Sequence, residues 1–174
     1  MIEKLKFIKA AYGYENHHKC AFNHQGLRSF EYLLSCMNTS FSEERDKLWI
    51  AIYIPHSAMA WRTRNNLTNI RKFAGHIAAI QEVFNTPDMN NGYDKQWPLG
   101  LKAGRIFRLK EPCLELRNVL SPNDYRSFMG YARRSSAMEL GADAEKEILR
   151  KISETGLLEV PFTKLENYTS LRIG

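Results

Sequence analysis

Residues 48–54 form the longest uninterrupted apolar stretch of the 174-residue chain. This stretch, LWIAIYI, is rich in β-branched and aromatic residues, and Pro55 follows it directly. Its length and composition predict a buried β-strand, and it is far shorter than the roughly 20 apolar residues that a membrane-spanning helix needs. The chain is 44% hydrophobic, which is enough for a packed core, and its length fits a single domain over 1–174.

The segments around this strand predict both helices and further strands. Strands are expected at 73–84, 101–109 and 157–162, with Gly75 at a bulge or close backbone approach, and a loop is expected at 86–92. Helices are expected at 25–38, in a short turn at 113–120, from Ser121-Pro122 onward, and at 143–154 with Asp143 as N-cap and Gly156 as stop. Together these elements predict an α+β fold with a mixed set of strands and about three helices outside it.

Positive charge is concentrated in the middle of the chain. The formal net charge is +6, but residues 61–134 hold 13 Lys and Arg against 6 Asp and Glu, and the segments before and after have net charges of +1 and −2. Seven aromatic residues lie among these cations: Trp61, Tyr93, Trp97, Phe107, Tyr125, Phe128 and Tyr131. Cations for phosphates and flat rings for bases are typical of a nucleic-acid-binding surface. A soluble basic domain with these rings in its core would have the same composition.

Catalytic and cofactor-binding motifs are absent from the sequence. None of GxGxxG, GxxxxGK[ST], GxSxG and HExxH occurs, and no lysine has an acidic residue two positions before it, which disfavours a restriction-type nuclease. His17, His18, Cys20 and His24 have ligand-type side chains, but the second pair that a zinc site needs is missing. We therefore expect a polar loop there, with neither a metal nor a cofactor.

Three widely spaced cysteines indicate reduced thiols. Cys20, Cys36 and Cys113 are odd in number and form no CxxC motif, and the first residues lack the hydrophobic region of a signal peptide. The expected location is cytoplasmic, and no membrane partner is expected. Neither Cys36 nor Cys113 has an evident activating neighbour, so a thiol nucleophile is disfavoured.

Three segments occur in a recognisable order over about 110 residues. Residues 46–53 (DKLWIAIY) are a strand ending in tyrosine, and residues 73–83 (FAGHIAAIQEV) begin with a glycine and end near "EV". In residues 97–112 the pair Trp97-Pro98 precedes a basic strand, and Glu111-Pro112 follows it. A short helix, the sequence RRSS at 133–136 and a terminal helix come next. In this order the chain from about 45 to 155 resembles the PUA-like superfamily, most closely the EVE domain and its relative, the YTH domain.

The resemblance implies a PUA-like core over 46–160, in which helices wrap a mixed, β-barrel-like sheet. Residues 1–45 would be a divergent N-terminal part, and residues 56–72 replace a familiar loop of the family. Members of the superfamily bind nucleic acid, and several hold a flipped, modified base in an aromatic cage. The implied function is a noncatalytic module that reads a methylated or hydroxymethylated base, with DNA favoured over RNA. The implied partners are nucleic acid and a protein such as a nuclease or NTPase subunit.

A base reader needs flat walls, polar groups for the base edge and cations for phosphates. The expected base pocket consists of Trp61, Trp97, Tyr53 and Asn65. The expected phosphate-binding groups are Arg62, Arg64, Lys102, Arg105, Arg133, Arg134 and Ser135. In an extended strand Lys102 and Arg108 would share one face, while Arg105 would point to the other. Trp49 lies inside the apolar run and is expected in the core.

Two other classes of function stay open at this point. One is an enzyme of nucleic-acid or small-molecule metabolism that uses residues such as His17, His24 or Glu82. The other is a protein-interaction module with a basic surface. Salt-dependent nucleic-acid binding would favour the reader over the interaction module, and metal-dependent turnover would favour the enzyme.

Overall fold

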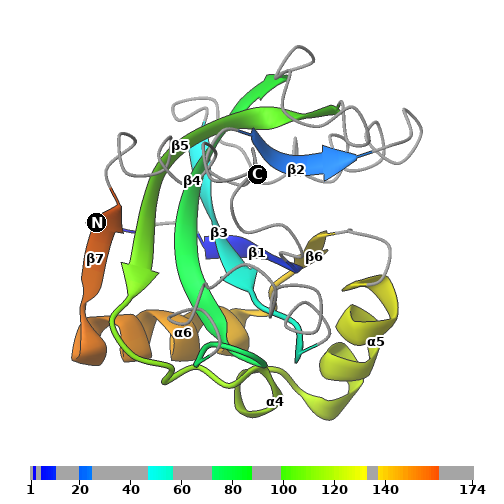
Figure 1. Cartoon of the computed structure of the whole chain (residues 1–174). Helices are drawn as coiled ribbons and strands as arrows, with labels where there is room; N and C mark the ends of the chain where they lie inside the picture. Colours follow the sequence, from blue (N-terminus) through cyan, green and yellow to red (C-terminus); the bar gives the residue numbers. More distant parts are fainter. Residues whose placement is uncertain are drawn as a thin grey trace, which may run out of the picture.

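The computed structural model describes residue 2 and residues 5–10, 20–24, 47–56, 72–87, 99–132 and 137–160 (Figure 1). These residues form one seven-stranded mixed sheet and three helices, which agrees with the predicted α+β class. The strands are β1 (Leu5–Ala10), β2 (Cys20–His24), β3 (Lys47–Tyr53), β4 (Ile77–Pro87), β5 (Leu99–Leu109), β6 (Ala137–Glu139) and β7 (Leu157–Val160). The helices are α4 (Leu116–Val119), α5 (Pro122–Ala132) and α6 (Ala142–Thr155).

The sheet is built around β3. Its strand order is β2-β5-β4-β3-β1-β6, and β7 pairs with β5 beside this path. β3 runs parallel to β1 and antiparallel to β4, and the other pairs are antiparallel. Residues 48–53 are all buried, as a continuous apolar strand covered on both faces must be. The strand predicted from LWIAIYI is thus confirmed.

The register of the strands separates two faces of the sheet. Trp49 lies opposite Glu82, and Ile80 lies opposite Phe107, so these four side chains share one face. α6 packs on that face, with Ile148 buried, and it crosses behind β4 and β5 in Figure 1.

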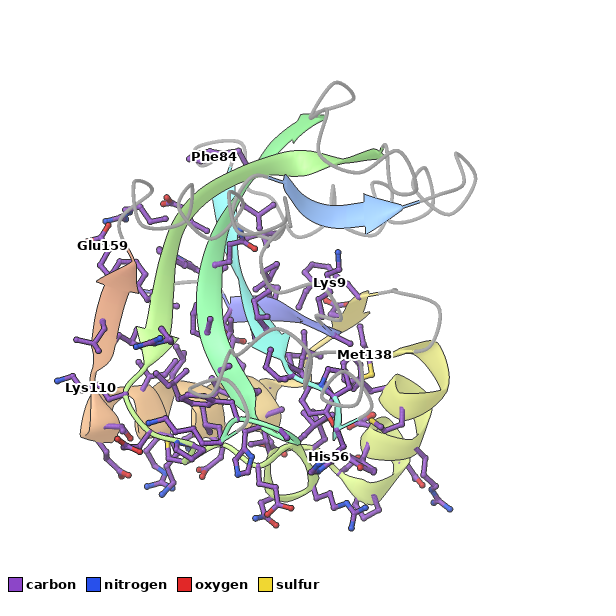
Figure 2. All side chains as sticks on the ribbon, in the orientation of Figure 1. Lys9, His56, Phe84, Lys110, Met138 and Glu159 are labelled. Carbon is purple, nitrogen blue, oxygen red and sulfur yellow. The ribbon has the colours of Figure 1, made fainter. Side chains whose placement is uncertain are left out.

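The other face of the sheet is equally buried. A row of paired residues runs across it from Lys9 in β1 through Ile52 and Ala79 to Arg108. Figure 2 shows Lys9 pointing from β1 toward the side of the molecule where β2 crosses. Lys9 is only 2% exposed although it is charged.

The N-terminal strands differ from the expectation. β1 joins the middle of the sheet, and Glu145 of α6 fixes it by accepting hydrogen bonds from the Leu5 backbone N–H (3.2 Å) and from Lys6 Nζ (2.9 Å). Cys20 and His24 lie in β2, which pairs with β5, and not in a polar loop. The physical reason is that both strands gain their stability from distant partners, and local polarity does not indicate such pairing.

Several element ends also differ. Residues 72–75 form a turn, and His76 forms an isolated bridge with Glu115. β4 therefore begins four residues later than predicted, and it extends to Pro87, into the predicted loop. α6 begins at Ala142 with Gly141 as N-cap, which places Asp143 in the first turn instead of at the cap. Gly156 does end this helix, with a φ of 79°. The predicted helix at 25–38 lies outside the described residues.

The start of α5 is confirmed. Ser121 Oγ accepts a hydrogen bond from the Asp124 backbone N–H (3.1 Å), and Pro122 is the first helical residue, as expected for an N-cap followed by proline. The short helical turn and the last strand are confirmed as α4 and β7. Within the described part of the chain, no helix is long and apolar enough to cross a membrane.

Gly75 has the left-handed conformation that the turn before β4 requires. Its φ is 80°, its N–H donates to the Ile54 carbonyl (2.8 Å), and an added Cβ would meet the His56 ring. We expect Gly75→Ala to lower the free energy of unfolding by about 1–2 kcal/mol, because L-residues are disfavoured there. Gly130→Ala is the control, since a Cβ at this helical position meets nothing within 4 Å; it should raise stability by about 0.5–1 kcal/mol. Urea denaturation measures both, and equal stabilities of the two variants would contradict the prediction.

Candidate functional site

A hollow of about 460 Å³ lies between the sheet and the C-terminal half of α6. β3, β5 and the start of β7 form its sheet side, and α6 forms the opposite side. Its lining residues are Ile2, Trp49, Arg105, Phe107, Leu149, Ile152, Ser153 and Leu157. We call this space the α6 hollow. Its walls are mostly apolar, and its one ionisable group is Arg105.

Two aromatic rings hold the guanidinium of Arg105 in place. The guanidinium carbon lies 5.7 Å from the ring centroid of Trp49 and 5.6 Å from that of Phe107. The two centroids are 5.6 Å apart, and the ring planes are inclined by 52°. Such cation–π contacts orient an arginine while leaving its edge available for hydrogen bonds. The Arg105 side chain is 49% exposed, so it stands at the rim of the hollow.

The buried carboxylate of Glu82 pairs with Arg105 and orients it. Its side chain is 6% exposed. Oε2 accepts hydrogen bonds from the Arg105 backbone N–H (3.2 Å) and from Nε (3.4 Å), and Oε1 accepts from Nη2 (3.5 Å). A buried carboxylate is costly unless it is paired in this way. A Cβ on Gly104 would lie 2.6 Å from Glu82 Oε2, so glycine at 104 makes room for the pair.

The predicted base pocket is not assembled among the described residues. Trp61, Trp97 and Asn65 lie outside them. Tyr53 was expected at a pocket mouth, but it is 1% exposed and packs edge-on against Phe128 of α5, with ring centroids 5.6 Å apart. It is therefore a core residue, because α5 covers the end of β3.

Trp49 is a core residue, as predicted, and is 4% exposed. It nevertheless forms part of the wall of the α6 hollow. Its plane is tilted against that of Phe107, and the Arg105 guanidinium already lies over both rings. A flipped base needs an open, flat ring face, so these two rings do not form an aromatic cage.

Most of the predicted phosphate-binding groups also lie outside the described residues: Arg62, Arg64, Arg133, Arg134 and Ser135. Lys102 lies in β5 opposite Cys20. Arg105 is exposed but paired with Glu82. Arg108 is opposite Ala79, on the other face from Glu82, which confirms that Arg105 and Arg108 point to different sides of the strand.

Two oriented arginines near α5 were not predicted. Arg117 Nε donates to the Tyr125 hydroxyl (3.2 Å), and the guanidinium carbon lies 5.5 Å from the centroid of the Tyr125 ring. The hydrogen bond that Arg117 donates to Tyr125 raises the pKa of Arg117 above its ordinary value. Arg126 donates from Nη2 to Asn123 Oδ1 (2.7 Å) and from Nε to the Pro122 carbonyl (3.3 Å). Asn123 and Arg126 are three residues apart, a spacing that could have indicated their contact.

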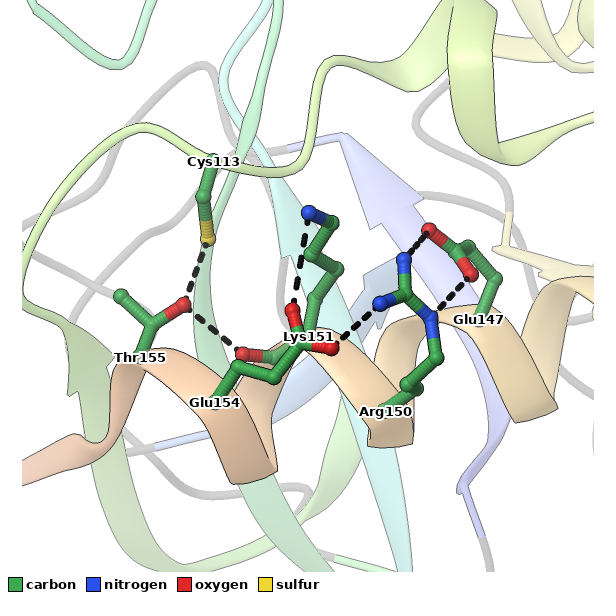
Figure 3. Close-up of polar contacts among 6 residues, drawn as sticks. All are labelled: Cys113, Glu147, Arg150, Lys151, Glu154 and Thr155. Atoms are coloured by element: carbon green, nitrogen blue, oxygen red, sulfur yellow. Dashed lines mark hydrogen bonds and ion pairs between the residues drawn. The ribbon is translucent and has the colours of Figure 1, made fainter.

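Two basic residues in the C-terminal half of α6, Arg150 and Lys151, are already paired with carboxylates. Arg150 is bonded to both Glu147 and Glu154, and Lys151 Nζ lies 3.6 Å from Glu154 Oε2 (Figure 3). The hydrogen bond from Arg150 lowers the pKa of Glu147. In the same view, Cys113 Sγ contacts Thr155 Oγ1 at 3.3 Å. The partner of this thiol is thus a hydroxyl and not a base, which agrees with the disfavoured nucleophile.

The described residues contain no group of three or more His, Cys, Asp or Glu that could hold a metal ion. Of the residues considered for an enzyme, Glu82 is bonded to Arg105, His24 lies in β2, and His17 is outside the described part. No protein-family model, curated protein or solved structure matches the chain. The expected relationship to the PUA-like superfamily therefore stays a prediction.

The Glu82–Arg105 pair should stabilise the fold measurably. We expect a double-mutant cycle of Glu82→Gln and Arg105→Gln to give a favourable coupling of about 1 kcal/mol, because one partner is buried and the other half exposed. The control is the cycle of Glu147→Gln and Arg150→Gln on the exposed face of α6, where solvent screens the pair and the coupling should be smaller. Urea unfolding of the wild type and the six variants measures both couplings. A larger coupling for the exposed pair would contradict this interpretation.

Proposed function

We propose that this chain is a noncatalytic nucleic-acid-binding module that reads a modified base, with a PUA-like core over 46–160. The observation that supports this most directly is the net charge of +7 on residues 61–134, in a chain whose total is +6. A surface that neutralises several phosphates requires such an excess. The mixed sheet with three helices is compatible with a PUA-like core, although many other α+β proteins share this composition.

The oriented arginines of α4 and α5 support a phosphate-binding role. Arg117 and Arg126 are both exposed, and each is held by a hydrogen bond to a neutral side chain, Tyr125 or Asn123. An arginine that is already oriented loses little side-chain entropy when it binds a phosphate. Lys72 and Lys110 are also exposed, and Figure 2 shows Lys110 where β5 ends. Lys72 is paired with Glu111 at 3.2 Å, so it contributes less.

The base pocket in this proposal consists of Trp61, Trp97 and Asn65. Tyr53 is removed from the set because it is buried under α5. Arg105 is also removed from the phosphate-binding set, because its guanidinium is paired with Glu82. Arg62, Arg64, Lys102, Arg133, Arg134 and Ser135 remain proposed phosphate contacts. Flipping a base out of a duplex costs a few kcal/mol, whereas stacking on an aromatic ring stabilises each base by about 1–3 kcal/mol. Several of these groups must therefore bind the base together. DNA is the favoured target, and a nuclease or NTPase subunit is the proposed protein partner.

The deciding experiment is a titration with short fluorescent oligonucleotides at several salt concentrations. The set contains single- and double-stranded DNA and RNA, with and without 5-methylcytosine, 5-hydroxymethylcytosine or N6-methyladenine. We expect tighter binding of one modified oligonucleotide, and loss of that preference in Trp61→Ala and Trp97→Ala. Salt-sensitive binding without preference would leave a general nucleic-acid binder. An absence of binding at low salt would overturn the proposal and favour an enzyme or a protein-interaction module.

Arg117 in α4 and Arg126 in α5 generate a separate prediction. Arg117→Gln and Arg126→Gln should each reduce the slope of log affinity against log salt by about 1, with equal weakening for all sequences, because phosphate contacts do not distinguish bases. Arg150→Gln is the matched control, since Arg150 is already bonded to two carboxylates on α6, and it should leave the slope unchanged. If all three variants have the same slope, Arg117 and Arg126 are not part of the phosphate-binding surface.

A further inference from the structure

The α6 hollow has the dimensions of a small-molecule site. Its volume of about 460 Å³ lies within the range of known ligand pockets, about 300–1,000 Å³. Six of the eight lining residues are apolar, from Ile2 on one side to Leu157 on the other. The hollow therefore fits an apolar body better than it fits water.

Arg105 gives the hollow one directed polar group. Glu82 engages the guanidinium through Nε and Nη2. Among the described residues, no hydrogen bond is made by Nη1 of Arg105, and the side chain is half exposed at the rim. An arginine edge of this kind matches the two oxygens of a carboxylate. Ser153, exposed on α6, is the second polar residue of the lining.

The charge of the site restricts the ligand further. Glu82 already balances the charge of Arg105, so an incoming anion gains hydrogen bonds more than net attraction. A dianion such as a phosphate monoester would also be repelled by the buried carboxylate. A ligand with a single negative charge and an apolar body fits both the paired Arg105 and the apolar walls of the hollow. The inclined rings of Trp49 and Phe107, already covered by the guanidinium, leave no open face for a nucleobase.

We propose that the α6 hollow binds a monocarboxylic acid with an apolar chain, with the carboxylate on Arg105 and the chain between β5 and α6. This inference does not rest on the proposed nucleic-acid-binding function. The chain of the acid contacts Leu149, Ile152 and Leu157, and the acid displaces water from apolar surface. The rings of Trp49 and Phe107 already orient the Arg105 guanidinium, so the side chain needs little rearrangement when the acid binds.

Isothermal titration of the full chain with straight-chain carboxylates, from hexanoate to dodecanoate, tests the proposal. Affinity should rise about fourfold per methylene until the hollow is full, as the burial of a CH₂ group implies. The carboxylate should bind about tenfold or more tightly than the primary alcohol of the same length, because its hydrogen bonds to Arg105 are charge-assisted. The alkyl phosphate and alkylammonium ion of equal length should bind more weakly than the carboxylate.

Two variants separate the polar and apolar parts of the site. Arg105→Gln should abolish the preference for carboxylate over alcohol, and Arg150→Gln, the control outside the hollow, should keep it. Leu149→Phe should shorten the chain length at which affinity stops rising. The comparison of acid and alcohol on the unchanged protein needs no variant, so it decides the question even if Arg105→Gln does not fold. Equal binding of acid and alcohol, tighter binding of the ammonium ion, or no saturable binding up to dodecanoate would overturn the proposal.

Discussion

The pairing of β3 with β1 on one side and β4 on the other is the constraint on which the rest of the structure depends. It places Trp49 between Leu5 and Glu82, and thereby decides which side chains face α6. Because a shift of one residue would move every side chain of β3 to the opposite face, the hydrophobic pattern of this strand specifies the register strongly. This register determines both the face that carries Trp49 and Glu82, on which α6 packs, and the opposite face, which carries Lys9 and Ile52.

The polar part of the interior shows how a charge can be accommodated in such a sheet. Glu82 is tolerated because Arg105 pairs with it and Gly104 leaves space beside it. Two rings from β3 and β5 then cover the guanidinium. Replacing Arg105 would remove these hydrogen bonds from the buried Glu82 carboxylate, and a side chain at position 104 would collide with that carboxylate. The ion pair, the glycine and the rings therefore form one structural unit.

The sequence predicted those features that are encoded locally. The LWIAIYI strand, the Ser121-Pro122 helix start and the Gly156 helix end each depend on a few adjacent residues, and all three are present. β1 was missed because Lys6 and Lys9 interrupt its apolar pattern, and β2 because its partner lies in β5. Tyr53 was misplaced because the end of a strand does not reveal which helix covers it. The contacts of Arg105 with Glu82 and of Arg117 with Tyr125 arise from tertiary packing, which no spacing in the sequence indicates.

The bond between the Leu5 backbone and Glu145 joins residues 140 positions apart. β1 also lies parallel to β3, an arrangement that requires a long crossover between them. During synthesis on a ribosome, β1 can pair with β3 only after residue 53 has emerged, and α6 can fix it only after residue 145. Contacts this distant make folding slow. β1 therefore joins the sheet in two steps, first by pairing with β3 and much later by its hydrogen bonds to Glu145 of α6.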